Sequence, residues 1–274
     1  MNEPPKELTP SNAPIGMSTM SPAMADMQHY PAYLLQLVNE HLGPSVWEIG
    51  IGNGQTVRAL IARGHRVVAT DVALECLEAL CLSLQHSDQT GGDRVRTLQI
   101  DLNAPSSLHP LRDESVDSVI SFNVLEHIEN DAAALAAIRS VVPDHAVLGL
   151  IVPAHPSLYG KMDAQAGHYR RYTRATLRSV LEQSGWAVQH CRYVNALGAA
   201  GWWYHNRWRR DTALDDPSVN HQMRFADRWL PTIAKVTDFW LGSWFGLSVL
   251  AIATAAALPN SPPNRERTPG AASG

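Results

Sequence analysis

The chain has 274 residues, of which 45% are hydrophobic and 18% are charged, a composition that predicts one large globular domain with a substantial core. A formal net charge of −4 at pH 7 gives no basic field for nucleic acid, so no nucleic-acid partner is expected. Three cysteines without CxxC or CxxH spacing favour neither a disulfide framework nor a zinc site. No metal is predicted, and a reducing cytoplasm is the expected compartment.

Both ends are predicted to be disordered, because residues 1–25 and 259–274 are rich in proline and have no apolar core. A first helix is predicted over about residues 31–42, opened by Pro31 and stopped by Gly43 and Pro44. Strands and helices then alternate. The predicted strands cover residues 45–49, 65–71, 94–101, 116–122 and 146–153, and the predicted helices cover residues 55–62, 73–85 and 131–142.

Valine, isoleucine and leucine fill these strands and helices separate them, which predicts a parallel sheet covered by helices on both faces. Beyond Pro153 the sequence predicts a loop-rich stretch to Tyr172, a helix over about residues 174–183 capped by Thr173, and a strand at residues 186–194. Two cap elements are predicted at residues 155–172 and 196–245, the second of them helical and rich in tryptophan.

One uncharged stretch, from Phe239 to Leu258, is long enough to cross a bilayer. Glycines and serines interrupt this stretch, and a buried strand at residues 247–255 is the favoured interpretation. Membrane contact is therefore not expected. A membrane-associated enzyme that acts on a lipid or a cell-envelope precursor remains an open alternative.

Three alternating glycines follow the first strand in the stretch "VWEIGIGNGQTVRAL", at Gly50, Gly52 and Gly54. A dinucleotide-binding loop has its third glycine one position later, where this chain has Gln55. The lysine of a phosphate-binding P-loop is also absent. The loop is therefore shaped for close approach of a ligand to the backbone, without either phosphate-binding signature.

Carboxylates accompany the first three predicted strands. Glu48 lies on the first strand just before the glycines, where it would hold an ammonium group or order the loop. Asp71 ends the second strand, at the position where a carboxylate accepts two hydrogen bonds from a ribose diol. Asp101 ends the third strand, where it would bind an adenine amino group. Three carboxylates at successive strands predict a nucleoside site.

The stretches "EIGIGNG", "ATD", "QIDL" and "FNVLEHIEND" resemble the class I S-adenosylmethionine-dependent methyltransferases, and the resemblance covers about residues 30–257. It implies an α/β fold with a Rossmann-like seven-stranded sheet, helices on both faces, an antiparallel last strand and a helical cap insertion before it. It assigns residues 26–258 to this domain and S-adenosyl-L-methionine as the cofactor. Matched motif by motif, the cofactor-binding residues are Glu48, Gly50, Gly52, Gly54, Asp71, Asp101, Leu102 and Asn123.

The acceptor is expected beyond the fourth and fifth strands, at "NVLEHIE" and "PAHPSLYGKMDAQAGHYRRYT". The second stretch resembles a narrower subgroup of small-molecule methyltransferases that act on natural products and cell-envelope precursors. Three histidines, His127, His155 and His168, compete as the general base. The alternative for His127 is a helix cap, and for His168 a structural latch that docks the next helix.

Aromatic residues are the other acceptor-side candidates. Tyr159, Tyr169, Trp202 and Trp203 are expected to contact the acceptor, with core packing or a homo-oligomer interface as the alternative. Few charges near them favour an apolar acceptor. A cluster of aromatic rings would also stabilise positive charge through the ring faces.

The expected function is transfer of a methyl group to a small, largely apolar metabolite in secondary metabolism. Methylation at oxygen or nitrogen requires a base. Methylation of a prenyl or alkene carbon instead requires an aromatic cage, as in the prenyl-chain methyltransferases of teleocidin-type indole alkaloids, which the chain also resembles. A nicotinamide-dependent oxidoreductase and a non-catalytic partner subunit are the more distant alternatives.

A lid is predicted at the start of the first helix, in "HYPAYLLQL". If Pro31 opens that helix, Tyr30 lies just before it and Tyr33 lies about one turn further on, so the two rings share a face outside the sheet core. This segment would order on binding and exclude water from the cofactor. The alternative is a helix that only packs on the sheet.

Overall fold

The computed structural model describes residues 27, 29–85, 92–196, 227, 237 and 245–256. The two predicted disordered ends lie outside these residues, as do Trp202, Trp203 and most of the predicted cap at residues 196–245.

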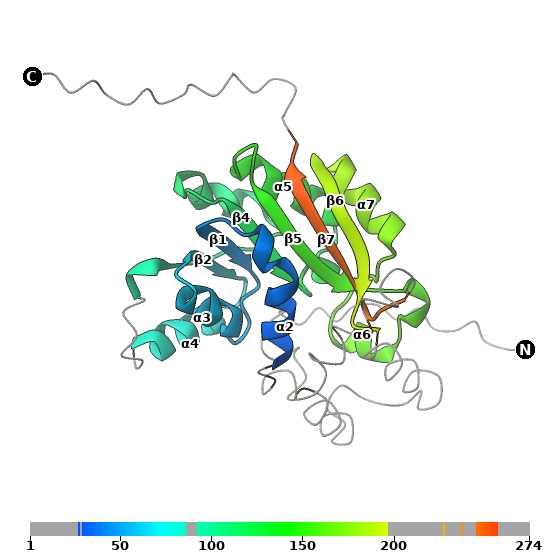
Figure 1. Ribbon diagram of the computed structural model, residues 1–274, viewed down its shortest axis with the longest axis horizontal. Coiled ribbons are helices and arrows are strands. Elements are labelled where there is room, and N and C mark those ends of the chain that lie inside the picture. Colours follow the sequence, from blue (N-terminus) through cyan, green and yellow to red (C-terminus); the bar gives the residue numbers. More distant parts are fainter. Residues whose placement is uncertain are drawn as a thin grey trace, which may run out of the picture.

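One seven-stranded sheet forms the centre of the molecule, with the strand order β3-β2-β1-β4-β5-β7-β6 (Figure 1). β7 runs antiparallel to both of its neighbours, and the pairs among β1 to β5 are parallel. The predicted sheet with its antiparallel last strand is therefore confirmed. The strands are β1 (Ser45–Ile49), β2 (Arg66–Asp71), β3 (Val95–Gln99), β4 (Ser118–Phe122), β5 (Val147–Pro153), β6 (Trp186–Val194) and β7 (Ser248–Ala255).

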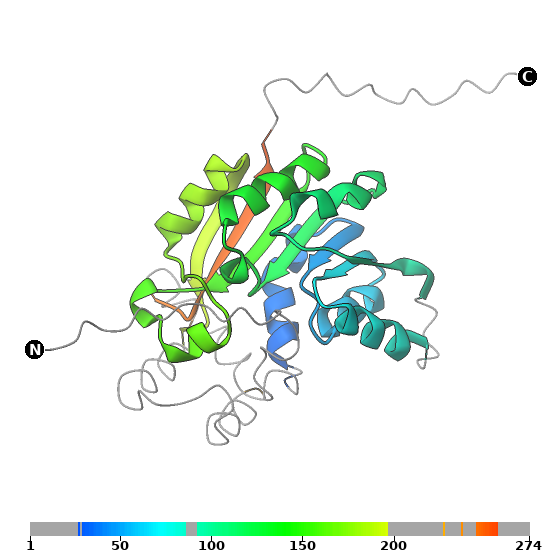
Figure 2. The same ribbon diagram turned by 180° about the vertical axis from the view of Figure 1, so that it is seen from behind.

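Helices cover both faces of this sheet, as Figure 1 and the reverse view in Figure 2 show. The α-helices are α2 (His29–Val38), α3 (Gln55–Ala62), α4 (Leu74–Gln85), α5 (Asp131–Val141), α6 (Lys161–Gln165) and α7 (Arg174–Gln183). Apolar residues of α2, α3 and α4 share one core cluster with the sheet. Apolar residues of α5, α7 and the 3₁₀ segment η4 (Pro105–Asp113) share a second core cluster with the sheet.

Alternating side chains of the strands divide between these two clusters. In β4, Val119 packs on the α5 side and Ile120 on the α2 side, and both are fully buried. In β7, Val249 and Leu250 divide in the same way. Because successive residues of a strand point to opposite faces, a strand that is apolar throughout must be covered on both sides.

β7 settles the interpretation of the uncharged C-terminal stretch from Ser248 onward. All but one of its residues are buried, as predicted for a strand in the sheet. None of the helices that the structure describes is long and apolar enough to cross a membrane. Residues 239–244, the first part of the same stretch, lie outside the described residues.

Side-chain capping and a left-handed glycine mark two of the helix boundaries. The Thr173 side chain accepts a hydrogen bond from the backbone nitrogen of Thr176 at 3.1 Å and caps α7 as predicted. Gly64, in the left-handed conformation at φ 90°, follows the end of α3.

Three expected boundaries are corrected. The first helix begins at His29, before Pro31, because the carboxylate of Asp227 accepts hydrogen bonds from the backbone nitrogens of His29 and Tyr30. β3 ends at Gln99, before Asp101, and the hydroxyl of Ser107 bonds the Asp101 backbone instead. The stretch before Tyr172, predicted to be loop-rich, contains α6.

Candidate active site

The candidate site lies at the edge of the sheet where the parallel strands end, the edge nearest α6 in Figure 1. β6 runs parallel to β5, so its end and the entry to β7 reach the same edge. Among the residues that the structure describes, three other than glycine have a positive φ, and each follows one of these strands: Asn123 at 55°, His155 at 59° and Asn195 at 59°. Strained backbone of this kind concentrates at functional sites.

The glycine loop begins this edge. Gly50, Gly52 and Gly54 have φ angles of 73°, 51° and 71°, a region that side chains disfavour. A Cβ atom on Gly50 would lie 2.3 Å from Cγ2 of Val124. The alternating glycines are therefore required by the loop's own geometry, because side chains at Gly50 and Gly54 would be strained and would meet Val124 and Leu80.

Asp71 holds this loop in place from the end of β2. Its Oδ2 accepts a hydrogen bond from the backbone nitrogen of Gly52 at 3.1 Å, and its Oδ1 accepts one from Ala73 at 2.9 Å. Burial raises the pKa of Asp71, against the opposing effect of these backbone hydrogen bonds. A third backbone hydrogen bond, from Val72, acts in the same direction on the pKa as the other two.

Glu48 lies beneath the loop with 4% of its surface exposed. Burial raises its pKa well above the usual value, and a hydrogen bond with Thr56 opposes that shift. Its Oε2 has no hydrogen-bond partner in the part of the chain that the structure describes. A buried acceptor in this state favours a cation or a hydrogen-bond donor from a ligand.

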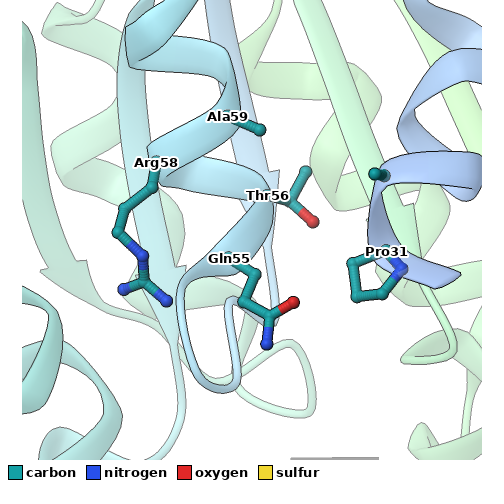
Figure 3. Close-up of a pocket in the computed structure, with 6 residues that line it drawn as sticks. Pro31, Gln55, Thr56, Arg58 and Ala59 are labelled. Atoms are coloured by element: carbon teal, nitrogen blue, oxygen red, sulfur yellow. The ribbon is translucent and has the colours of Figure 1, made fainter. Parts of the chain in front are cut away.

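A cleft of about 300 Å³ adjoins the loop, between the first turns of α2 and α3. Figure 3 shows Gln55 and Thr56 extending from α3 on the side of Pro31, while Arg58 points away along the other side of that helix. The helix α2 thus forms one wall of the cleft beside the glycine loop.

Three further predicted cofactor residues stand after β3 and β4. Asp101 is half-buried, and its Oδ1 accepts a hydrogen bond from the backbone nitrogen of Asn103 at 2.9 Å. Leu102 is buried. The backbone nitrogen of Asn123 donates to the carbonyl of Ile151 at 2.8 Å, which fixes its strained conformation beside β5.

His155 lies between two aromatic rings beyond the end of β5. Its ring stacks on Tyr193 at a centroid distance of 4.8 Å and on Phe245 at 5.0 Å. Its Nε2 is buried and bonds to none of the described residues. Burial lowers the pKa of His155, against a smaller opposing effect of the Gly246 backbone, so the ring is neutral at pH 7. Sequence reasoning missed both aromatic partners.

A second group of side chains, which we call the histidine–carboxylate cluster, consists of Glu126, His127, Asp163, His168 and Arg171. Nδ1 of His168 lies 2.8 Å from Oδ1 of Asp163, and Nε of Arg171 donates to the same oxygen at 2.8 Å. Asp163 is 1% exposed, and although burial raises its pKa, its hydrogen bonds with His168 and Arg171 outweigh that effect and lower the pKa. The rings of His127 and His168 meet edge to face at 4.6 Å.

This cluster weighs against two of the three candidate bases. Burial, and next the charge of His168, lower the pKa of His127 to about 3, so its ring is a very weak proton acceptor at neutral pH. His168 is held through its ring by Asp163, in the manner of the latch that was the alternative to catalysis. Of the three histidines, His155 has the geometry best suited to a base.

The aromatic candidates separate as well. Tyr33 is 2% exposed and belongs to the core cluster on the α2 side, which corrects its expected place outside the sheet core. Its ring does lie beside that of Tyr30, as predicted, with the ring centroids 6.2 Å apart. The hydroxyl of Tyr159 donates to the carbonyl of His168 at 2.6 Å. Tyr169 is 41% exposed beside Arg170.

Comparison with known proteins agrees with this geometry. Residues 47–148 match the family described as Methyltransferase domain. No curated protein matches the chain by sequence.

Solved structures share the fold at low sequence identity. A complex from Haloferax volcanii between the Trm112 methyltransferase activator and a candidate methyltransferase matches with 17% identity and a TM-score of 0.56, over 85% of this chain and 92% of that one. The [4+2]-cyclase SpnF matches with 11% identity and a TM-score of 0.54, over 84% of this chain and 82% of that one. Phosphoethanolamine N-methyltransferase 2 of Haemonchus contortus, in complex with S-adenosyl-L-methionine, matches with 14% identity and a TM-score of 0.54, over 83% of this chain and 53% of that one.

Proposed function

We propose that this chain, whose residues 47–148 match the family described as Methyltransferase domain, is an S-adenosylmethionine-dependent methyltransferase that transfers a methyl group to a small, largely apolar metabolite. The cofactor is S-adenosyl-L-methionine. When bound, it supplies an electrophilic methyl group. The chain's own residues must then align the acceptor, exclude water and, for an oxygen or nitrogen acceptor, remove a proton.

The residues at the glycine loop fit this cofactor. It is an adenosine with an amino-acid tail and no pyrophosphate, so a carboxylate-rich site without a lysine clamp suits it. We assign the unsatisfied Oε2 of Glu48 to the cofactor's ammonium group and Asp71 to the ribose hydroxyls. Asp101 and Leu102 would hold the adenine, and Asn123 would lie beside the methionine end.

The proposal of an apolar acceptor rests on the surroundings of His155. An apolar acceptor suits the two aromatic rings that flank it, and its unpartnered Nε2 suits a base. We propose that Nε2 takes the proton of a hydroxyl or amine acceptor as the methyl group is transferred. Tyr193 and Phe245 would hold the acceptor's apolar part.

Substitution of His155 by glutamine is expected to lower kcat by about 10²- to 10⁴-fold, the usual contribution of a positioned general base. Because a base must be neutral and burial lowers the pKa of His155, kcat/KM of the wild type should begin to fall at a lower pH than it would with an ordinary histidine as the base. Turnover of a methyl-accepting metabolite, measured as the pH is lowered from neutrality, checks both expectations. An unchanged rate in the variant would contradict the role.

The aromatic flanks of His155 favour a second candidate, methylation of an alkene carbon, in which the rings stabilise a carbocation. A phenylalanine at position 155 separates the two reactions, since it keeps an aromatic face and lacks a basic nitrogen. Loss of activity in both His155→Gln and His155→Phe indicates a base. Retained activity in His155→Phe alone indicates a cage.

We restrict the proposed lid to the first turn of α2, because Tyr33 and the buried residues that follow it in this helix belong to the core. This turn is held by Asp227, which accepts hydrogen bonds from the backbone nitrogens of His29 at 3.1 Å and Tyr30 at 2.8 Å. Asp227 also lies 3.0 Å from Nδ1 of His29. We propose that this contact holds the lid over the cleft beside the glycine loop.

Asp227→Ala should therefore loosen the first turn of α2 by about 0.5–2 kcal/mol, the range for loss of a helix cap. Amide hydrogen exchange at residues 29–32 should become faster, and the dissociation constant of S-adenosylhomocysteine should rise. Asp227→Asn, which keeps an acceptor oxygen, is the matched control. Unchanged affinity in a variant with faster exchange would show that this turn is only a packing element.

A further inference from the structure

Glu126, His127 and His168 bring three metal-ligand groups together from two separate segments. Glu126 and His127 belong to the 3₁₀ turn η5 (Leu125–His127) that follows β4, and His168 comes from the segment after α6. One carboxylate oxygen and one nitrogen from each imidazole all lie within 4.8 Å of one another. None of the three has an assigned contact with the cofactor.

The carboxylate of Glu126 is the least satisfied group in this arrangement. It is 0% exposed, and neither of its oxygens has a hydrogen-bond partner among the described residues. Nδ1 of His127 is likewise buried and unpartnered there. Nε2 of His168 lies 4.0 Å from Oε1 of Glu126, which is too far for a hydrogen bond. Leaving such groups bare in the interior is unfavourable, so they point to a missing partner.

The surroundings of His168 prepare it as a ligand. Oδ1 of Asp163 lies 2.8 Å from its Nδ1, and a carboxylate there requires the proton on Nδ1, which leaves a lone pair on Nε2. Asp163 is itself fixed by Arg171 at 2.8 Å and by the backbone nitrogen of Gly160 at 3.0 Å. A carboxylate behind a histidine is the usual support of a metal-bound imidazole.

We propose that Glu126, His127 and His168 bind a divalent transition-metal ion of the zinc type. Two imidazoles and one carboxylate suit zinc, cobalt or iron(II) and not magnesium or calcium, which prefer all-oxygen sites. A tetrahedral ion with bonds near 2.1 Å needs ligand atoms about 3.4 Å apart. The three groups must therefore approach by about 1 Å, which rotation of the side chains supplies.

Such an ion joins η5, which follows β4, to the segment that carries His168 and Arg171. Three protein ligands leave a fourth position open. The side chain of His168 is 17% exposed and that of Glu126 is fully buried, so solvent reaches the site from the side of His168. The ion fixes the wall of the site that lies beside the acceptor.

The test uses the full-length, tag-free protein after dialysis against EDTA, titrated with zinc sulfate and, separately, with cobalt(II) chloride. One equivalent of zinc should bind and raise Tm, and cobalt should give the visible absorption of a tetrahedral nitrogen–oxygen site. Asp163→Asn, which removes the carboxylate behind His168 and leaves the three proposed ligands in place, should weaken binding by about 10- to 100-fold. E126Q and H168Q should weaken it more. His109→Gln, an exposed histidine in η4, is the matched control and should bind zinc as the wild type does.

Failure of the wild-type protein to bind one equivalent of either ion would overturn the proposal, and this arm needs no variant to fold. Binding that survives E126Q and H168Q but not His109→Gln would also overturn it, as an adventitious surface site. If E126Q stabilises the metal-free protein and no ion binds, Glu126 is a neutral acid and the cluster holds no metal.

Discussion

Replacing Asp163 with alanine is expected to lower the free energy of unfolding by about 3–5 kcal/mol, the penalty for breaking a buried ion pair by removing one partner. Asp163 is 1% exposed and accepts hydrogen bonds from Arg171, at 2.8 Å, and from the backbone nitrogen of Gly160, at 3.0 Å. Arg171 is itself buried. Without this carboxylate, the guanidinium group loses its hydrogen-bonded counter-ion, although it keeps the 3.2 Å hydrogen bond to the carbonyl of Ala154.

Urea unfolding followed by circular dichroism in the presence of EDTA measures this change apart from any metal effect. Asp163→Asn should lower the free energy of unfolding by less than Asp163→Ala does, because it keeps an acceptor oxygen. Asp93→Ala, an exposed carboxylate in the 3₁₀ segment η3 (Gly92–Arg94), should change the free energy of unfolding by under about 0.5 kcal/mol. A loss below about 1 kcal/mol in Asp163→Ala would mean that the network is not what docks this segment.

Asp71→Ala is expected to weaken binding of S-adenosylmethionine by about 2–4 kcal/mol, or roughly 30-fold to nearly 1,000-fold. The carboxylate is proposed to bind the ribose, and it also holds the glycine loop through the backbone nitrogen of Gly52. Both contacts are lost together in the alanine variant. The free energy of binding should therefore fall by more than a single neutral hydrogen bond accounts for.

Isothermal titration with S-adenosylhomocysteine measures this loss directly. Asp71→Asn keeps one acceptor oxygen, so its affinity for S-adenosylhomocysteine should lie between those of the wild type and the alanine variant. Glu78→Ala, an exposed carboxylate on α4, controls for net charge. Binding within threefold of the wild type in Asp71→Ala would refute the assignment.

Local patterns predicted the elements that depend on nearby residues. The period of the apolar residues gave the strands, Thr173 gave the start of α7, and the glycine triplet gave a loop that the structure holds in left-handed conformations. Each of these signals acts within a few residues of the element that it specifies. The same applies to β7, whose unbroken apolar run requires cover on both faces.

Contacts between distant segments could not be predicted in this way. Asp227 caps α2 from 198 residues away, so the helix begins earlier than its own sequence indicates. Phe245 and Tyr193 reach His155 only because β7 lies between β5 and β6 in the sheet. The residues flanking His155 follow from strand order, which one sequence does not reveal.

The histidine–carboxylate cluster has the same origin. His127 and His168 both stood out as candidate bases, but their mutual contact and the burial of Glu126 depend on how the segment after α6 folds back on η5. No spacing typical of a metal site links them in the sequence. Their chemistry therefore emerges only from the folded chain.

A crystal structure of the full-length protein with S-adenosylhomocysteine tests the account most directly. It should place both ribose hydroxyls within hydrogen-bond distance of Asp71, the amino group of the ligand beside Glu48, and its sulfur on the side of His155. A ligand bound at another edge of the sheet, or a ribose that does not contact Asp71, would contradict the account.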